Sequence, residues 1–353
     1  MSKKFHESYD LEEEEEEKEK QPTTFGSLLT LLLLILAAIL WFGALPEYTE
    51  FMLTETESNR SLLDVEVPGD GTIPGRADEE AVFVFFDVGA GNSILLQSPD
   101  NSTSLIDGGE GKDPRKSEIP AYNLAQNLYQ PFFNITGIQR LRKMVSTTPF
   151  SHYMGAQVDL LRYSDLEINE ILLPPYEGHF PPFRFLEAEA EGGIDIGSLE
   201  SEQELIFGPG LKGKVLQTNA HPENRAEASS VLYLKYGNIR ILITSHLPRE
   251  GEKELVLNWG RSLDVDLLVV GRHGGDCATG DELLEHADPT FAVITRDEEN
   301  LLTEGTKTVI DRLQEAEVES RNIYRTDRDS HVALYTDGNR VRFQRNAFPF
   351  LSH

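Results

Sequence analysis

The sequence predicts an α/β domain of two mixed β-sheets with helices outside, preceded by one transmembrane helix. From residue 81 onward, apolar strand-like runs alternate with helical stretches, which include candidate helices over 119–132 and 249–259. Some strands are joined by short turns, as at Tyr236-Gly237-Asn238, whereas others are separated by helices, and this mixture indicates mixed sheets. An uncharged apolar run over residues 25–45 predicts the transmembrane helix.

The chain divides into four predicted segments. Residues 1–24 form a polar tail with a glutamate run from Glu12 to Glu17, and such like-charge runs stay solvated, so we expect disorder there. A partner-binding acidic tail is the alternative. Residues 25–45 are the predicted transmembrane helix, residues 46–80 a linker rich in acids, Ser, Thr, Gly and Pro, and residues 81–347 the folded domain.

The apolar run favours an uncleaved single-pass anchor. About 20 apolar residues suffice to cross the hydrocarbon core of a bilayer. A cleaved signal peptide is the alternative, but the preceding region is long and acidic, and residues 43–46 make a poor cleavage site. Four lysines precede the run and Arg60 is alone in the first stretch after it, which places the tail in the cytoplasm and the domain outside.

Charge and cysteine content exclude several classes of function. The chain of 353 residues carries a formal charge of −28, and a surface this negative repels phosphate backbones, so nucleic-acid binding is disfavoured. Cys277 is the only cysteine, which excludes an intrachain disulfide and a multi-thiolate zinc site.

Two motifs open the folded segment. Residues 86–93 read FDVGAGNS and residues 105–109 read LIDGG, so glycine turns place Asp107 just beyond a buried strand. The pair resembles the opening hairpin of metallo-β-lactamase-fold domains of ComEC-type DNA-uptake proteins, which reads DVGQGD[AS] and then LIDGG. Ala90 and Asn92 replace the Gln and Asp of that pattern. The resemblance covers about residues 81–345 and implies a four-layer αββα sandwich.

The next motif of this family is a metal-binding loop of the form HxHxDHxxG, which holds two metals that activate a water. Residues 147–155 match it in position. The resemblance puts Thr147 and Pro149 at the first two histidines and Ser151 at the aspartate, while His152 is retained. Hydroxyls are poor metal ligands at neutral pH and proline has no side-chain donor. The first metal position has therefore lost both ligands that this loop would supply.

Two later motifs complete the resemblance. Residues 229–246 are similar to SxVLxLxYGxxxxLLTGD, with His246 at the bridging aspartate, and residues 268–275 are similar to LxVxHHGS, with His273 at the second histidine. If the superposition holds, His152, His246 and His273 converge on the second metal position. Three neutral imidazoles and a water are a sufficient zinc set. The resemblance makes Asp87 and Asp107 outer-shell residues and leaves open whether His221 is a further ligand.

Three functions follow from these motifs. The favoured one is a non-catalytic, membrane-anchored protein with a binding or structural role in the cell envelope, with an envelope protein as a possible partner. The reason is that a two-metal mechanism needs nearly all of its ligands at once. The alternative is a mono-zinc hydrolase. A conventional metal-dependent phosphodiesterase or nuclease is third, because four ligand positions have changed and the chain is acidic.

Overall fold

The computed structural model describes residues 69–89, 91–111, 123–163, 165–175, 194–218, 228–296 and 304–351. The predicted tail, the predicted transmembrane helix and most of the predicted linker lie outside these ranges. Within them, no helix is both long and apolar enough to cross a membrane. Residues 67–353 form one compact unit. Its first described residues pack onto the sandwich, because Ile73 is fully buried and its N–H donates to Gln97 Oε1 at 2.9 Å.

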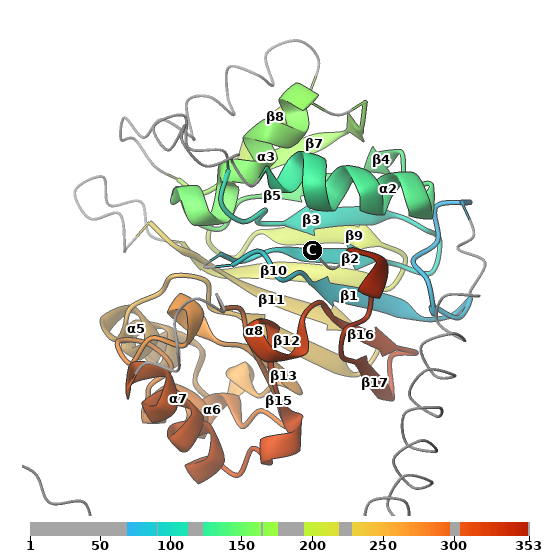
Figure 1. Cartoon of the computed structure of the whole chain (residues 1–353). Coiled ribbons are helices and arrows are strands. Elements are labelled where there is room, and N and C mark those ends of the chain that lie inside the picture. The colour runs from blue at the N-terminus through green and yellow to red at the C-terminus, as the bar shows by residue number, and fades with distance from the viewer. Residues whose placement is uncertain are drawn as a thin grey trace, which may run out of the picture. The chain divides into compact units, whose positions relative to one another are not determined.

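Two mixed β-sheets face each other, as the alternation of strands and helices predicts (Figure 1). The first sheet has the order β17-β16-β1-β2-β3-β5-β7-β8 and the second the order β15-β14-β13-β12-β11-β10-β9. The strands of the first sheet are β1 (Ala81–Phe85), β2 (Ile94–Gln97), β3 (Thr103–Ile106), β5 (Lys143–Val145), β7 (Glu170–Leu173), β8 (Asp195–Ser198), β16 (Val332–Thr336) and β17 (Val341–Gln344). Those of the second are β9 (Glu204–Gly208), β10 (Leu211–Thr218), β11 (Ser230–Tyr236), β12 (Ile239–Ile243), β13 (Leu267–Val269), β14 (Phe291–Ile294) and β15 (Ile323–Arg325).

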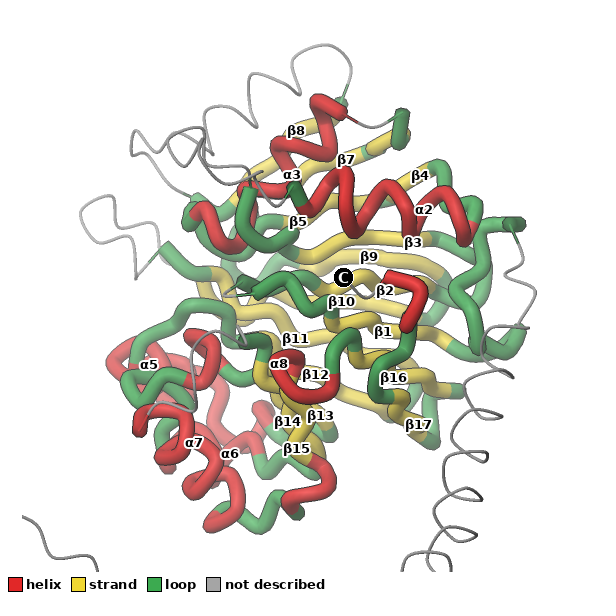
Figure 2. The backbone as a smooth tube through the Cα atoms, viewed as in Figure 1, coloured by secondary structure: helices red, strands yellow, loops and turns green. Residues whose placement is uncertain are grey.

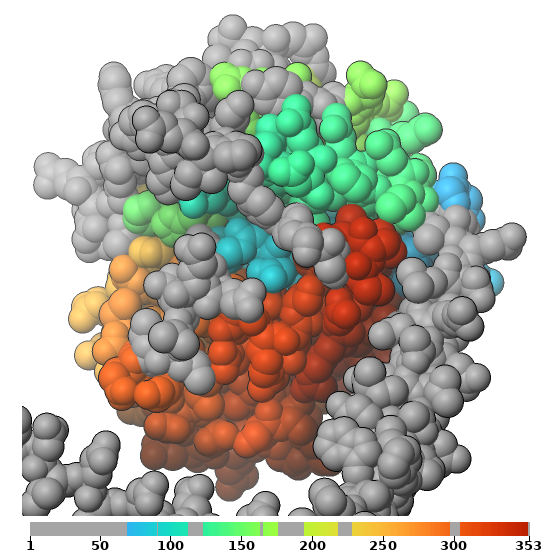
Figure 3. All heavy atoms as spheres, in the orientation of Figure 1, coloured from blue at the N-terminus to red at the C-terminus, as the bar shows by residue number. Residues whose placement is uncertain are grey.

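Helices cover the outer face of each sheet (Figure 2). A π-helical turn (Ala125–Tyr129), α2 (Gln130–Thr136) and α3 (Ser151–Tyr163) pack on the first sheet, and α5 (Arg249–Trp259), α6 (Asp281–Ala287) and α7 (Glu304–Glu315) pack on the second. The remaining short elements are α8 (Thr326–Asp329), the strand pair β4 (Arg140–Leu141) and β6 (Glu167–Ile168), and 3-10 turns at Gly260–Leu263, Gly271–Gly274, Ser320–Asn322 and Pro349–Leu351. In the space-filling view the green residues of the N-terminal half lie above the orange and red residues of the C-terminal half (Figure 3).

The core has three apolar layers, which make the arrangement a four-layer sandwich. Successive side chains of a strand point to opposite faces. In β1, Phe83 and Phe85 therefore enter the layer between the sheets, while Val82 and Val84 face the helices together with Phe132 of α2. A third layer lies between the second sheet and helices α5, α6 and α7. The αββα architecture that the resemblance implies is the one observed.

Strand direction brings the loops that carry the motifs together. β3 and β5 are parallel, and so are β12 and β13. The loops after the two strands of each pair therefore leave the sheet at the same end, where the carboxyl ends of the strands lie. Two hydrogen bonds join those edges: Ser230 N–H donates to Thr147 O at 2.7 Å, and the Tyr153 hydroxyl donates to Ser245 O at 3.3 Å.

The element predictions hold where the apolar pattern is strong. The helix predicted over 249–259 is α5 with the same ends, and the turn predicted at Tyr236-Gly237-Asn238 joins β11 to β12, with Gly237 at φ 58°. The helix predicted over 119–132 begins later among the described residues, at the π-helical turn. β9 and β10 were not predicted. In β10, two lysines and a glycine interrupt the apolar positions and are typical of a loop, whereas β9 has only three consecutive apolar residues.

Candidate functional site

The loops at the shared edge have an unusual backbone. Asp107, Ser245, Arg272 and His273 all have positive φ, at 55°, 53°, 50° and 56°. Left-handed φ values are unfavourable for residues with a side chain, and such strain persists only where the surroundings hold it. It concentrates at functional sites, and here it lies on three of the loops that carry the motifs.

The structure brings the three predicted histidines together. His152 lies in the first turn of α3, His246 follows β12 and His273 follows β13. The ring centroids of His152 and His273 are 5.3 Å apart and those of His152 and His246 are 5.8 Å apart. Residues from three separate loops therefore form one imidazole cluster, here called the histidine cluster (His152, His246 and His273).

All three imidazoles are held in the neutral form. Burial lowers the pKa of His152 to about 4. Burial, followed by the charge of Arg272, lowers the pKa of His246 to about 3. Burial, followed by the proximity of His152, lowers the pKa of His273 to about 3. Neutral imidazole is the form that binds a metal, so the cluster is in its metal-binding protonation state at neutral pH.

Several ring nitrogens of the cluster have no hydrogen-bond partner in the described part of the chain. They are Nδ1 of His246 and both Nδ1 and Nε2 of His273. Buried polar atoms without a partner are rare and call for an explanation, such as an ion. No group of three His, Cys, Asp or Glu side chains in the described ranges is already arranged around a metal position. The rings would have to turn about χ2, a broad torsion for histidine. Three neutral imidazoles are by their chemistry a sufficient donor set for one zinc-type ion, and the binding of a metal here stays a prediction.

Aromatic side chains pack against the histidine cluster. The Phe150 ring lies 4.5 Å from His246 and 5.3 Å from His152, and the Tyr153 ring lies 5.1 Å from His273, measured between centroids. These contacts exclude water from one side of the cluster and account for the lowered pKa values. Neither aromatic residue was predicted as part of the site, since a single aromatic residue, whether in a loop like Phe150 or in a helix like Tyr153, carries no distinguishing pattern.

Asp107 accepts hydrogen bonds from Thr147 and Asn92, the two residues that replace a histidine and an aspartate of the family motifs. It is fully buried, and its carboxylate accepts from Thr147 N at 2.8 Å, from Thr147 Oγ1 at 3.0 and 2.8 Å, and from Asn92 Nδ2 at 2.9 Å. Burial raises the pKa of Asp107 to about 7, and the bonds from Thr147 and Asn92 oppose that rise. The hydroxyl of Thr147 binds the Asp107 carboxylate. A hydrogen-bond network, here called the Asp107 network (Asp107, Thr147 and Asn92), therefore occupies the side of the site where the family has its first metal position.

The other two changed positions provide no metal donor. Pro149 is buried in the loop before α3, and Ser151 is the first residue of that helix. Their neighbour Phe150 accepts the first helical bonds, from the N–H groups of Tyr153 at 3.0 Å and Met154 at 3.1 Å. This part of the loop therefore serves to begin α3 and to place His152.

A buried glutamate supports the loop after His273. Glu252 in α5 accepts hydrogen bonds from Thr279 N–H at 2.5 Å and Gly280 N–H at 2.9 Å. Arg312 in α7 donates to the carbonyl oxygens of residues 276, 278 and 279 at 3.3 to 3.4 Å. The hydrogen bonds of these two side chains hold in place the segment that joins His273 to α6.

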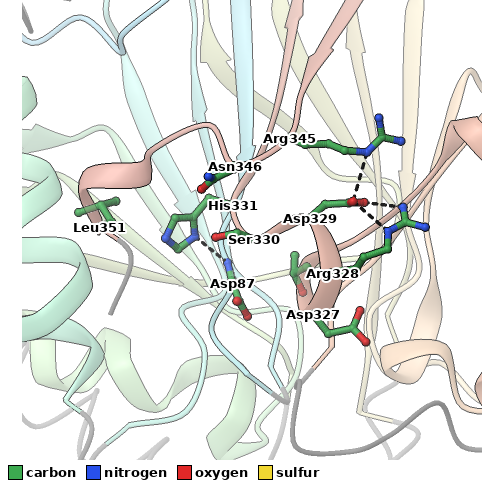
Figure 4. A pocket seen from close by; sticks show the side chains of 10 residues that line it. Asp87, Asp327, Arg328, Asp329, Ser330, His331, Arg345, Asn346 and Leu351 are labelled. Atoms are coloured by element: carbon green, nitrogen blue, oxygen red, sulfur yellow. Dashed lines mark hydrogen bonds and ion pairs between the residues drawn. The ribbon is translucent and has the colours of Figure 1, made fainter. Parts of the chain in front are cut away.

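Asp87 lies in a different surrounding from the one the resemblance implies for an outer-shell residue. It lines an open pocket of about 530 Å³, and its backbone N–H donates to His331 Nδ1 at 3.0 Å (Figure 4). The same pocket holds Asp329, whose carboxylate binds Arg328 at 2.7 Å and Arg345 at 3.2 Å. The role of Asp87 toward the histidine cluster stays a prediction, and His221 lies outside the described residues.

Comparisons with known proteins agree with the resemblance. The chain is 26% identical over 262 residues to ComE operon protein 3 of Bacillus subtilis and 25% identical over 240 residues to competence protein ComA of Neisseria gonorrhoeae. These alignments cover 72% and 67% of this chain but 33% and 30% of the relatives, so the chain matches about a third of their length. No model of a protein family matches.

Solved structures align with the chain more distantly. CmlA, a diiron beta-hydroxylase from Streptomyces venezuelae, aligns at a TM-score of 0.45 and 12% identity, over 75% of this chain and 54% of that one. The metallo-beta-lactamase fold protein YhfI from Bacillus subtilis aligns at 0.43 and 14% identity, over 70% and 96%. The described domain is an α/β sandwich of two mixed sheets, and the chain is similar in sequence to competence proteins.

Proposed function

We propose that this domain is a one-metal member of the metallo-β-lactamase superfamily, in which the histidine cluster holds a zinc-type ion and supports hydrolysis. The observation that carries the proposal is the convergence of three neutral imidazoles, of which His246 and His273 have ring nitrogens without a hydrogen-bond partner in the described ranges. Zinc on three imidazoles supplies Lewis acidity and an acidified water. The Asp107 network speaks against a second metal, because Asp107 is engaged by Thr147 and Asn92.

The protein residues have separate tasks in this proposal. His152, His246 and His273 bind the ion, and the rings of Phe150 and Tyr153 exclude water from one side of it. The Asp107 network fixes the loop from which His152 follows. Hydrolysis then depends on one ion.

The experiment is a metal analysis of the full-length protein in detergent, stripped of metal and then offered Zn²⁺. We expect about one equivalent of retained zinc, since three imidazoles and one open position form a complete catalytic zinc set. His273→Ala should lose it. His286→Ala is the matched control, because His286 lies on α6 and contacts only its own helix, through Glu282 O at 2.9 Å.

The outcomes separate enzyme from non-enzyme. Zinc retained by the wild type and by His286→Ala, but lost from His273→Ala, supports the site, and cleavage of chromogenic phosphate or carboxylate esters that requires His273 supports hydrolysis. A well-folded wild type that retains less than about a tenth of an equivalent contradicts the zinc site.

The second candidate is a non-catalytic binding or structural role, which the Asp107 network favours. In this role the domain is anchored in the membrane through residues 25–45, faces outward from the cytoplasm and contacts an envelope protein. Deleting residues 25–45 should release the protein from the membrane fraction. A deletion variant that still sediments with membranes would contradict the anchor.

A further inference from the structure

Arg272 is a charged residue at the histidine cluster, and its charge has no partner within the described ranges. Its backbone is fixed on both sides, because its N–H donates to Ser245 O at 2.9 Å and its carbonyl accepts from Gly275 N–H at 3.0 Å. Its side chain is partly buried and makes no hydrogen bond or ion pair with any residue in the described ranges. Its charge contributes to the lowered pKa of His246 and of His273 and opposes the raised pKa of the Tyr153 hydroxyl, which places the guanidinium beside the cluster.

Two buried carboxylates on the neighbouring elements are engaged by other groups. The carboxylate of Asp107 accepts from Thr147 and Asn92. The carboxylate of Glu252 accepts from two backbone N–H groups of the loop that follows Arg272. Within the part of the chain that the structure describes, a neutral cluster therefore lies beside a guanidinium that pairs with no carboxylate and can receive a negative group.

The left-handed backbone of Arg272 supports this reading. Glycine or asparagine would occupy φ 50° at less strain than arginine. Glycine does follow two residues later, at Gly274 with φ 75°. The chain thus keeps a long cation at a strained position that a smaller residue would fit better, and the side chain rather than the backbone accounts for arginine there.

We propose that Arg272 binds the oxyanion of a small ligand whose reacting part lies at the histidine cluster. This inference rests on the proposed function, because it needs the cluster to be a ligand site. A guanidinium recognises a carboxylate or a phosphate through two parallel hydrogen bonds. The ligand is a small molecule with one terminal oxyanion rather than a nucleic acid, because the chain carries a charge of −28 and repels a polyanion over its whole length.

The test is a calorimetric titration of the zinc-loaded full-length protein with inorganic phosphate, with acetate and with a single-stranded DNA oligomer. Arg272→Gly removes the cation and relieves the backbone strain, so it should fold. Arg272→Lys keeps the charge without the two-pronged geometry. Arg261→Ala is the control, because Arg261 is exposed and lies before β13, whereas Arg272 follows that strand at its opposite end.

We expect Arg272→Gly to weaken binding of the preferred small anion about 10- to 100-fold, with Arg272→Lys between it and the wild type and Arg261→Ala unchanged. Tighter binding of phosphate than of acetate identifies a phosphoryl ligand, and the reverse identifies a carboxylate. Affinities of Arg272→Gly and the wild type that agree within about threefold overturn the proposal. Tighter binding of DNA than of either small anion overturns it as well.

Failure of the zinc site is distinguishable from failure of this inference. If the wild type retains no zinc, the proposed function is wrong, and the same titration is then read on the metal-free protein. Anion binding that disappears in Arg272→Gly still supports the role of Arg272. Binding that is absent from the wild type, or equal in the two proteins, overturns it.

Discussion

Replacing Thr147 by valine removes one donor from the Asp107 network and keeps the shape of the side chain. The Thr147 hydroxyl lies 3.0 and 2.8 Å from the two carboxylate oxygens of Asp107, while the backbone N–H of residue 147 stays in place at 2.8 Å. The variant therefore isolates a single buried hydrogen bond. Thr148→Val is the matched control, because the Thr148 hydroxyl is buried and has no partner in the described part of the chain.

The free energy of unfolding that Thr147→Val loses depends on pH, because Asp107 titrates near neutrality. Burial raises its folded pKa to about 7, whereas an unfolded aspartate has a pKa of about 3.9. Protonated Asp107 therefore stabilises the fold fully below about pH 4. This stabilisation, on the order of 4 kcal/mol, is lost as pH rises through 7. A hydrogen bond to the neutral acid contributes about 1 kcal/mol and one to the charged form about 1.5 to 3 kcal/mol. Thr147→Val should thus lose about 1 kcal/mol at pH 5 and about 1.5 to 3 kcal/mol at pH 8.5.

The assay is urea unfolding of the metal-free full-length protein at both pH values, followed by tryptophan fluorescence. Trp259 at the end of α5 reports on the domain, because its indole N–H donates to Leu216 O at 3.0 Å. Thr148→Val should match the wild type at both pH values. The reasoning is refuted if Thr147→Val loses the same free energy at pH 5 and pH 8.5, or if Thr148→Val loses as much.

Three further variants test the surroundings of the cluster. Gly91→Ala should cost about 1 to 3 kcal/mol and reduce zinc retention, because its Cβ would overlap the carbonyl of His152, and normal retention would contradict this. Glu252→Gln should cost about 1 to 3 kcal/mol in urea unfolding by weakening the bonds from Thr279 and Gly280, with a loss of zinc, and an unchanged midpoint would contradict it. The pKa of His152 is lowered to about 4, so the stability that its neutral form provides is present above about pH 6.5 and is lost as pH falls toward 4. His152→Gln should reduce this loss of unfolding free energy at acid pH. An unfolding free energy with the same pH profile as the wild type would refute the assignment.

Much of the fold was predictable from local patterns. β1, β11 and β12 are continuous or alternating apolar runs, and α5 has the same ends as predicted. β8 was missed because it is an exposed, polar edge strand, and only its pairing with β7 makes it a strand. The predicted transmembrane helix lies outside the described residues and stays a prediction.

The candidate site, like the fold, was predictable from the sequence in part. The order and spacing of the motifs sufficed to select His152, His246 and His273, and to identify Thr147 as a changed ligand position. The sequence contains no sign that Thr147 binds Asp107, because the two residues are 40 positions apart and their bond depends on β3 and β5 being parallel neighbours. Phe150 and Tyr153 were missed for the same reason.

The sequence by itself determined the fold class, the residues that stand at each motif position and the polar or apolar type of each side chain. These are local properties, since periodicity, turn chemistry and residue type are read within a few positions. Only the tertiary structure decided that the rings of His246 and His273 lie 5.8 and 5.3 Å from that of His152, that Asp107 is bonded by Thr147, and that Arg272 has no counter-charge in the part of the chain that the structure describes. Burial and pairing arise when distant strands meet, so they shift a pKa or leave a charge unpaired in ways that no single stretch of chain encodes.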